Sequence, residues 1–290
     1  MSAEIAYKRF VFIISQSVNT VLSVLKILIK SKFGIHLPKA VSESCIVLGN
    51  GPSLKQSLQN HPNFFKNHPL ICVNSFSLTE QYGELKPEYY VMLDPSFWYE
   101  NDEFAKNTIE CIKEKTTWKL YLLIPQHAAN SAVFQELIIK NSNIILTPFN
   151  YTVFKGFEWA AHKVYINNLA MMQSQNVLVA TLFLSINIGF KKIYLVGADH
   201  SWLETLVVNE NNEVCFKSVH FYENENRVGL HPFYKGAHTK EIFRMDEILI
   251  IWGKTFYGYT AINNYASSRH SVIYNASEFS FIDAFKRIKL

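Results

Sequence analysis

One short turn gathers the residue types that bind phosphate through the backbone: Gly49, Asn50, Gly51, Pro52 and Ser53, directly after an apolar run. Glycines allow a backbone to approach a ligand closely and to adopt positive φ. Ser53 would cap a helix that begins at residue 54, where free N–H groups and the helix dipole attract phosphate. The turn lacks the Gly-Lys-Ser/Thr of a P-loop and the third glycine of the dinucleotide fingerprint. We interpret it as a phosphate-binding turn; the alternative is an ordinary tight turn.

Polar residues also follow three further apolar runs. Asn74, Asp94 and the pair Asp199-His200, which comes after Gly197, each stand at the end of one run. In open α/β sheets, ligands lie outside the carboxyl ends of the strands. We therefore expect these side chains to converge with the glycine turn on one crevice. Any one of them is equally suited to be a turn residue or a helix cap.

Histidine and tyrosine are concentrated between residues 200 and 238. Four of the ten histidines lie there: His200, His220, His231 and His238. A neutral imidazole near a nucleotide suits a general base, and His238 would project from a loop–helix junction after Gly236. Tyr222 and Tyr234 lie in the same stretch and can donate to a phosphate. The histidine spacing does not fit a structural zinc site, and for each histidine the alternative is an ordinary hydrogen-bonded residue.

The elements that must position these residues are short apolar runs separated by helical segments. The predicted strands are residues 45–48, 70–73, 89–93, 120–124, 144–146, 193–196 and 272–274. Runs without polar alternation are typical of a parallel sheet that is covered on both faces. Helices are predicted from residue 54, over 168–188 with Gly189 as C-cap, over 239–261 and over 282–288. The pattern predicts a Rossmann-like, doubly wound α/β domain.

Residues 200–237 interrupt this alternation. Two apolar segments, 206–208 and 214–216, flank Asn-Glu-Asn-Asn, which resembles a hairpin turn. An insertion of this length in a compact domain is usually functional. We interpret it as a lid.

The first 40 residues form a separate unit, which precedes the domain of residues 41–290. From residue 10 to 29 only Lys26 is charged. Polar residues recur every three or four positions: Gln16, Asn19, Thr20, Ser23, Lys26 and Lys30. With Lys8, Arg9 and Lys32 near its ends, the segment is predicted to be an amphipathic helix lying on an anionic membrane surface. The alternative is docking on the domain's own core or on a second copy in a homo-oligomer. A cleaved signal peptide is disfavoured because no small-x-small site follows.

The amino-acid composition excludes several classes of protein and function. The chain has 290 residues, of which 49% are hydrophobic and 18% charged, which excludes disorder over most of the length. The net charge of +4 is dispersed, so nucleic acid is not an expected partner. The four cysteines have no close spacing and are expected to be buried free thiols. This suits a reducing compartment, and we expect a cytoplasmic protein at the inner membrane surface.

The residues also carry a family resemblance. Residues 46–54, Ile-Val-Leu-Gly-Asn-Gly-Pro-Ser-Leu, look like the opening of the bacterial sialyltransferases of glycosyltransferase family 42. Four further segments follow in the same order and at similar spacing: 72–76, 94–97, 188–199 and 236–238. The Gly-Asn-Gly-Pro-Ser-Leu and Gly-Ala-Asp features also resemble the broader group of MptE-like proteins. Many members of that group act in surface-polysaccharide pathways, and a pterin diphosphokinase also belongs to it.

The resemblance implies a modified GT-A domain with a lid and an inverting, metal-independent transfer. The implied donor is a CMP-sugar, carrying sialic acid, another nonulosonic acid or Kdo, and the acceptor is a cell-surface glycan or a lipid-linked precursor. In this interpretation the glycine turn, Asn74 and Asn176 hold the donor. His238 takes the proton of the acceptor hydroxyl, and Tyr222 and Tyr234 of the lid steady the departing phosphate.

Two departures from the family pattern leave alternatives open. Asp94 replaces an asparagine, and its carboxylate would repel that of a sialic acid. It would instead suit the hydroxyls of a neutral sugar, or Mg²⁺ or Mn²⁺. The family's tyrosine after the aspartate is absent, and Tyr222, Tyr234, His200 and His220 are candidates to replace it.

Two other functions remain alternatives at this point. One is an MptE-like, Mg²⁺-dependent diphosphokinase with Asp94 and Asp199 near the metal. The other is a non-catalytic nucleotide-binding partner in polysaccharide assembly.

Overall fold

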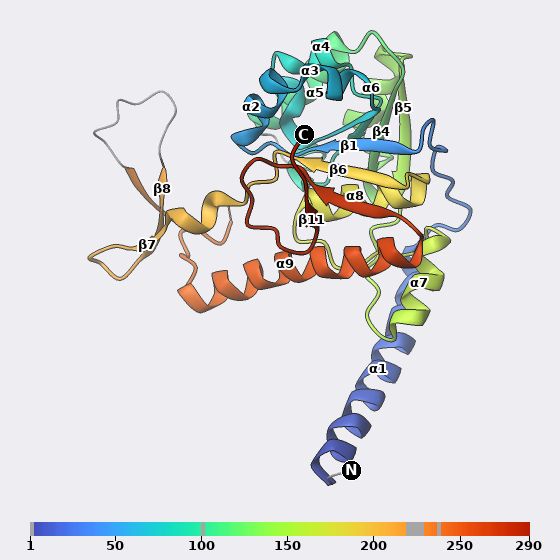
Figure 1. The fold of residues 1–290 in the computed structure, drawn as a ribbon, viewed down its shortest axis with the longest axis vertical. Coiled ribbons are helices and arrows are strands. Elements are labelled where there is room, and N and C mark those ends of the chain that lie inside the picture. The colour runs from blue at the N-terminus through green and yellow to red at the C-terminus, as the bar shows by residue number, and fades with distance from the viewer. Residues whose placement is uncertain (1–2, 100–101, 219–228, 237–238) are drawn as a thin grey trace.

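The computed structural model describes residues 3–99, 102–218, 229–236 and 239–290. Its centre is a sheet of eight strands in the order β11-β10-β6-β1-β2-β3-β4-β5 (Figure 1). Every neighbouring pair is parallel. The strands are β1 Ser44–Leu48, β2 Leu70–Val73, β3 Tyr89–Val91, β4 Leu120–Pro125, β5 Ile144–Phe149, β6 Lys192–Val196, β10 Val272–Asn275 and β11 Lys286–Arg287. The predicted parallel α/β sheet is confirmed.

Strand β1 shows why the apolar runs are continuous. Cys45 and Val47 belong to the apolar cluster on one face of the sheet, and Ile46 and Leu48 belong to the cluster on the other. None of these four side chains is exposed to solvent. Because both faces are covered, the strand needs apolar residues at every position rather than at alternate ones.

Helices cover both faces of the sheet. The α-helices are α1 Ala3–Lys30, α2 Ser53–Asn60, α3 Pro62–Lys66, α4 Gln81–Leu85, α5 Glu103–Lys115, α6 Ala132–Lys140, α7 Glu158–Ile166, α8 Val177–Ile188 and α9 Met245–Ser268. Short 3-10 helices are η1 Asn74–Leu78, η2 Pro95–Phe97, η3 Gln126–Ala128 and η4 Ser201–Thr205. Helices α2 to α6 pack on one face, and α7, α8 and α9 pack on the other (Figure 1).

Two helix starts differ from the prediction. Helix α8 starts at Val177 rather than at residue 168, because the Asn176 side chain caps it by accepting the Val179 N–H at 3.0 Å. Helix α9 starts at Met245 rather than at 239, where the Glu247 carboxylate accepts the Arg244 N–H at 2.9 Å. The predicted C-cap at Gly189 is confirmed, with a φ of 114°.

The predicted helix over residues 282–288 was wrong. Lys286–Arg287 forms strand β11, which pairs with β10 at the end of the sheet. The Arg287 guanidinium donates to the carbonyl oxygens of Ser277 and Ser280 at 3.1 and 3.0 Å. These bonds to an adjacent loop favour an extended chain over a short helix. Strand β5 likewise runs through Pro148, because an edge strand tolerates a missing N–H.

A second, antiparallel sheet occupies the predicted insertion. It contains β7 Leu206–Val208, β8 Val214–Ser218 and β9 Gly229–Pro232 in that order. The β7–β8 pair confirms the predicted hairpin. The small sheet stands away from the main body beyond one end of α9 (Figure 1). Aromatic contacts fasten it there, with the rings of Trp202 and Trp252 4.3 Å apart and Phe233 packed on Phe243.

Helix α1 contacts the domain through its polar stripe. The Thr20 hydroxyl accepts the Phe157 N–H at 3.0 Å, and the Ser23 hydroxyl donates to the Lys155 carbonyl at 2.8 Å. Ser23 is 2% exposed, whereas Phe10, Val21 and other apolar residues of the helix are about half exposed or more. The helix leaves the body at an angle, and its first half stands free (Figure 1).

The orientation of α1 therefore combines both interpretations of the first 40 residues. The helix docks on its own domain through the hydroxyl groups of Thr20 and Ser23 and through Ile27, which is buried in the apolar core, whereas most of its other apolar side chains stay uncovered. Of the helices in the described residues, α1 has the length and composition of a membrane span, and 11% of its most apolar window is buried. This is weak evidence for membrane association.

Candidate functional site

The glycine turn after β1 packs against the end of β6. The Gly49 N–H donates to the Val196 carbonyl and the Gly51 N–H donates to the Gly197 carbonyl, both at 2.8 Å. A Cβ at Gly49 or Gly51 would overlap the Gly197 carbonyl oxygen, and Gly197 itself has a φ of 68°. The glycines are therefore required by the close approach of two loops, whereas the sequence analysis attributed them to the approach of a ligand.

The start of α2 is capped by Asp199 and not, as expected, by the Ser53 side chain. Pro52 holds the N-cap position, and its side chain makes no capping bond. The Ser53 N–H donates to one Asp199 carboxylate oxygen at 2.8 Å, and the Ser53 hydroxyl donates to the other. Asp199 is 3% exposed. A carboxylate is the charge that a helix N-terminus favours, so a side chain takes the place expected for a phosphate.

The side chain of Asn50 lies at the solvent-exposed side of the turn. It is exposed, and its side-chain amide donates to the Val73 carbonyl at the end of β2, at 3.2 Å. The N–H groups of Gly49, Gly51 and Ser53 all donate within the chain. Binding of a nucleotide at this turn stays a prediction, and Asn50 is the residue of the turn best placed to touch it.

Asn74 and Asp94 shape the next strand ends along the sheet. Asn74 is half-buried with a φ of 46°, and its side-chain oxygen accepts the Leu93 N–H at 3.4 Å. Its carbonyl oxygen accepts the hydroxyl of Tyr90. Asp94 is exposed and caps η2 by accepting the Ser96 N–H at 3.0 Å. Both residues therefore hold turns, and Asp94 also presents a charge to solvent.

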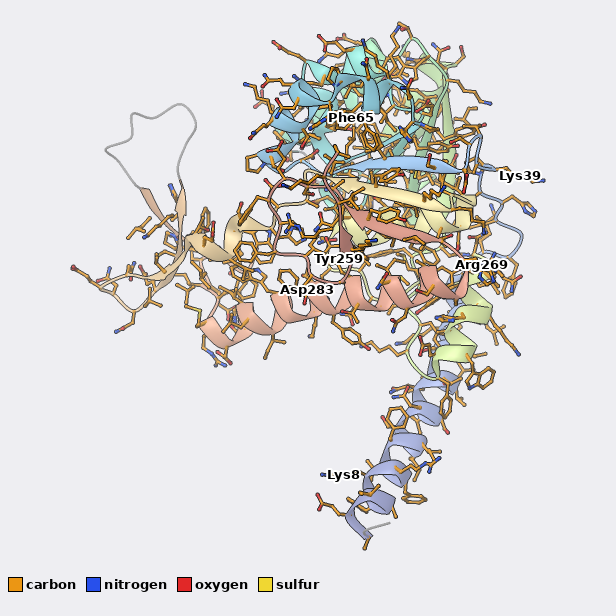
Figure 2. All side chains as sticks on the ribbon, viewed as in Figure 1. Lys8, Lys39, Phe65, Tyr259, Arg269 and Asp283 are labelled. Atoms are coloured by element: carbon orange, nitrogen blue, oxygen red, sulfur yellow. The ribbon has the colours of Figure 1, made fainter. Side chains whose placement is uncertain are left out.

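A second polar group lies where α8 and α9 meet the end of β6. The Asn176 amide donates to the Tyr259 hydroxyl at 2.9 Å, and that hydroxyl lies 2.7 Å from Nε2 of His200. Tyr259 projects from α9 toward the sheet and is fully buried (Figure 2). Asn176 thus caps α8 with its oxygen and orients Tyr259 with its nitrogen. The sequence analysis named Asn176 and His200 but missed Tyr259.

The environment of His200 keeps the imidazole neutral. Burial lowers the pKa of His200 from 6.5 to about 4. Since Tyr259 receives a hydrogen bond from Asn176, its own proton is free to go to Nε2, which puts the imidazole proton on Nδ1. Within the described residues, Nδ1 has no hydrogen-bond partner. His200, the residue after Asp199 in the sequence, therefore has a neutral imidazole whose Nδ1–H can donate a hydrogen bond.

An aromatic group that the sequence analysis missed lies after β3 and β4. The His127 ring stacks on the Tyr99 ring at 6.5 Å and contacts Trp98 edge-on at 5.8 Å. Tyr99 and His127 are exposed, and partial burial lowers the pKa of His127 from 6.5. Trp98 follows the turn at Asp94, and His127 follows the apolar run of β4. Both residues could have been found from the sequence, because ligands of α/β sheets lie outside the carboxyl ends of the strands.

The remaining predicted residues are apart from this edge or undescribed. Tyr234 is 45% exposed and pairs with Ile242 at the base of the small sheet. His231 lies in β9, where its ring contacts Phe216. His220, Tyr222 and His238 lie outside the described residues. Among the residues that are described, no group of three or more histidine, cysteine and acidic side chains is placed to hold a metal.

Comparisons with known proteins identify a family and find similar solved structures. Residues 17–205, more than half of the chain, match the sequence profile described as 6-hydroxymethylpterin diphosphokinase MptE-like. No curated protein sequence matches. The MAf glycosyltransferase of Magnetospirillum magneticum AMB-1 has a similar fold, with a TM-score of 0.47 and 10% identity over 89% of this chain. The chain spans 35% of the length of that protein.

Proposed function

Because this chain belongs to the MptE-like family, we propose a transferase that binds a nucleotide-activated group at the carboxyl edge of its sheet, and specifically a glycosyltransferase. The observation that carries the proposal is the order β6-β1-β2-β3 of four neighbouring strands. Each of the four ends in a polar group: His200, Asn50, Asn74 and Asp94. Parallel strands place these groups along one edge, where α/β domains bind their ligands.

The proposed donor is a CMP-activated sugar, as the motif resemblance implies. Asn50 and Asn74 would hold the nucleotide, and the Nδ1–H of His200 would donate to an oxygen of the sugar or the phosphate. The exposed carboxylate of Asp94 would accept hydrogen bonds from hydroxyl groups of the sugar. Sialic acid, another nonulosonic acid and Kdo are the proposed sugars.

The transfer would be inverting. The oxygen of the acceptor hydroxyl attacks the anomeric carbon, the bond from that carbon to the phosphate oxygen breaks, and CMP leaves with the electron pair. His238 would take the acceptor proton, and hydrogen-bond donors of the insertion, Tyr222, Tyr234 and His220, would stabilise the charge that develops on the phosphate. The acceptor would be a glycan or a lipid-linked precursor, brought to the protein at the cytoplasmic membrane surface by α1.

A second candidate is a pterin diphosphokinase, which the family description favours. It would move a diphosphate from ATP to a pterin hydroxyl with Mg²⁺, and Asp94 would be the carboxylate available to the metal. Asp199 would first have to leave Ser53, since both of its carboxylate oxygens accept hydrogen bonds from that residue.

Product analysis separates these functions. The full chain is incubated with CMP-linked acidic sugars and a glycan or lipid-linked acceptor, or with ATP, Mg²⁺ and a hydroxymethylpterin, and the released nucleotide is measured. Release of CMP supports the glycosyltransferase, and release of AMP with pterin diphosphate overturns it in favour of the kinase. Nucleotide binding without release of either product indicates a non-catalytic partner in polysaccharide assembly.

A further inference from the structure

A cavity of about 550 Å³ lies where α1 meets the carboxyl edge of the sheet. Lys26 and Lys30 line it from α1, Gln126 and His127 line it after β4, and residues 150–153 line it after β5. It therefore lies at the edge that carries the candidate site, three to four strands from β1. At the usual strand spacing that is about 14 to 19 Å along the sheet.

Hydrogen bonds fasten the end of α1 to one wall of this cavity. The Ser31 hydroxyl donates to the Thr152 hydroxyl at 2.8 Å. Asn150 accepts the Lys32 N–H at 2.9 Å and donates to the Lys32 carbonyl at 2.8 Å. Asn150 is 3% exposed. These bonds fix the end of α1, and therefore Lys26 and Lys30, at the carboxyl edge of the sheet.

The cavity is positively charged and has no counter-ion of its own. Its described lining contains two lysines and no acidic residue. Neither lysine forms an ion pair with any described residue. Like charges four residues apart on a helix repel each other, so this pair lowers stability when the cavity is empty.

One residue of the cavity lining, Gln126, also has a side-chain acceptor that lacks a donor. The side-chain oxygen Oε1 of Gln126 is buried and has no hydrogen-bond partner. A buried acceptor without a partner costs free energy, which a hydroxyl group of a ligand would recover. Charge and acceptor together match a ligand that carries an anionic phosphate and a sugar hydroxyl.

We propose that this cavity, the lysine cavity, binds the phosphate of a lipid-linked sugar, the acceptor of the transferase. This inference rests on the proposed function and names the acceptor's class and site. The phosphate would lie between Lys26 and Lys30, and a sugar hydroxyl would donate to Gln126 Oε1. The lipid would run along the exposed apolar side of α1, where Leu22, Leu25 and Ile29 are 49–81% exposed. His127 and Tyr99 would flank the sugar on the way to the donor site.

Vesicle flotation of the full chain tests this proposal. Three sets of phosphatidylcholine vesicles are compared: plain, with an isoprenyl phosphate, and with phosphatidylglycerol to the same surface charge. The double variant Lys26→Gln/Lys30→Gln is compared with Lys8→Gln/Arg9→Gln, a matched control that removes the same charge from the free end of α1 (Figure 2). Inorganic phosphate in solution is the fourth probe.

We expect wild type to prefer the isoprenyl phosphate vesicles over the phosphatidylglycerol vesicles. The Lys26/Lys30 variant should lose about 30-fold in affinity for the former, which corresponds to about 1 kcal/mol for each lysine. The Lys8/Arg9 variant should weaken binding to both anionic vesicles alike and keep the preference.

Three results would overturn the proposal. They are no preference in wild type, an equal loss of preference in both double variants, and tight binding of inorganic phosphate alone, which would make the ligand a soluble anion. Failure of the proposed function would show elsewhere, as an absence of nucleotide binding by the wild-type chain. The two failures are therefore distinguishable.

Discussion

Two parts of the sheet's carboxyl edge use their polar groups in opposite ways. In the middle, at β6 and β1, N–H groups of the glycine turn donate to β6 or to the residue after it, Asp199 accepts from Ser53, and Tyr259 joins Asn176 to His200. At the β4–β5 end, Lys26 and Lys30 have no ion pair among the described residues, and Gln126 Oε1 has no donor. The hydrogen bonds of the middle part are largely made within the chain, whereas the β4–β5 end lacks partners that a ligand could supply.

This difference indicates two kinds of site. A pre-formed network holds its few outward groups, Asn50 and the Nδ1–H of His200, in fixed positions, which suits a site of chemistry. A charged cavity with unpaired groups lowers the stability of the fold but can bind an anionic ligand more tightly, which suits the capture of such a ligand. Substitutions at β6 and β1 should therefore destabilise the fold, and substitutions in the lysine cavity at the β4–β5 end should not.

The largest expected effect is at the glycine contact. A Cβ in Gly197→Ala would lie 2.7 Å from the Gly49 carbonyl oxygen and 2.8 Å from the Leu54 Cβ, at a φ of 68°. Strained backbone and overpacking together should lower the free energy of unfolding by roughly 3–4 kcal/mol, measured by urea denaturation. Gly253→Ala is the control, because nothing lies within 4 Å of its Cβ position in α9. Equal stability of the two variants would contradict the contact.

His200 should make stability depend on pH. Its pKa is about 4 in the folded chain and 6.5 when free, so the unfolded chain binds more protons between these values. Stability is then complete above about pH 6.5 and falls as the pH drops toward 4, by up to about 3 kcal/mol. Urea denaturation across this range should show the slope in wild type and a smaller slope in His200→Asn. Asparagine tolerates the positive φ of 55°. Identical slopes would show that His200 is not the group that titrates.

Removing the charge of Asp199 should have a smaller effect. Asp199→Asn keeps an acceptor for the Ser53 N–H but loses the negative charge at the start of α2. We expect the free energy of unfolding to fall by about 1 kcal/mol, in line with charge–dipole interactions at helix ends. Thermal unfolding measures the change, with Asp94→Asn as an exposed comparison. A stability equal to wild type would mean that the carboxylate does not hold this helix end.

The smallest and opposite effect is expected in the lysine cavity. Without ligand, Lys30→Gln should leave the chain as stable as wild type or raise its free energy of unfolding by about 0.3 kcal/mol, because one repulsive pair is removed. Urea denaturation without added phosphate gives the comparison. A decrease of more than about 1 kcal/mol in the free energy of unfolding would show that Lys30 has a structural role. The contrast between the β6–β1 part of the edge and the lysine cavity would then not hold.

Local patterns predicted the strands, and tertiary contacts decided what the patterns missed. The short, continuously apolar run of residues 45–48 is followed by a glycine turn, which is typical of a strand covered on both sides. The C-terminal strand could not be predicted, because β11 depends on β10 and on carbonyl groups that bind Arg287. The start of α8 was predictable in principle, since asparagine at position 176 is a strong N-cap.

In the candidate site, too, contiguous residues could be recognised from the sequence, whereas contacts between distant segments could not. The turn at residues 49–53 is recognisable because its residues are contiguous, although its glycines serve a contact with Gly197 that no spacing reveals. The lysine cavity combines residues from three distant parts of the chain, of which only Lys26 and Lys30 were singled out from the sequence, as part of the polar stripe of an amphipathic helix. Tyr259 was missed because its role depends on Asn176, 83 positions earlier.

Binding of nucleotides to the purified full chain shows whether the carboxyl edge of the sheet is a site for a CMP-activated donor. The melting temperature is measured with CMP, CDP, UDP, GDP and ATP, each with and without Mg²⁺. A ligand at about 100 times its Kd adds about 2.7 kcal/mol, a rise of about 5 °C for a chain of this size. We expect a rise in melting temperature with CMP that does not require Mg²⁺ and that is smaller in Asn50→Ala. A rise only with ATP and Mg²⁺ would contradict it and make the diphosphokinase the better account.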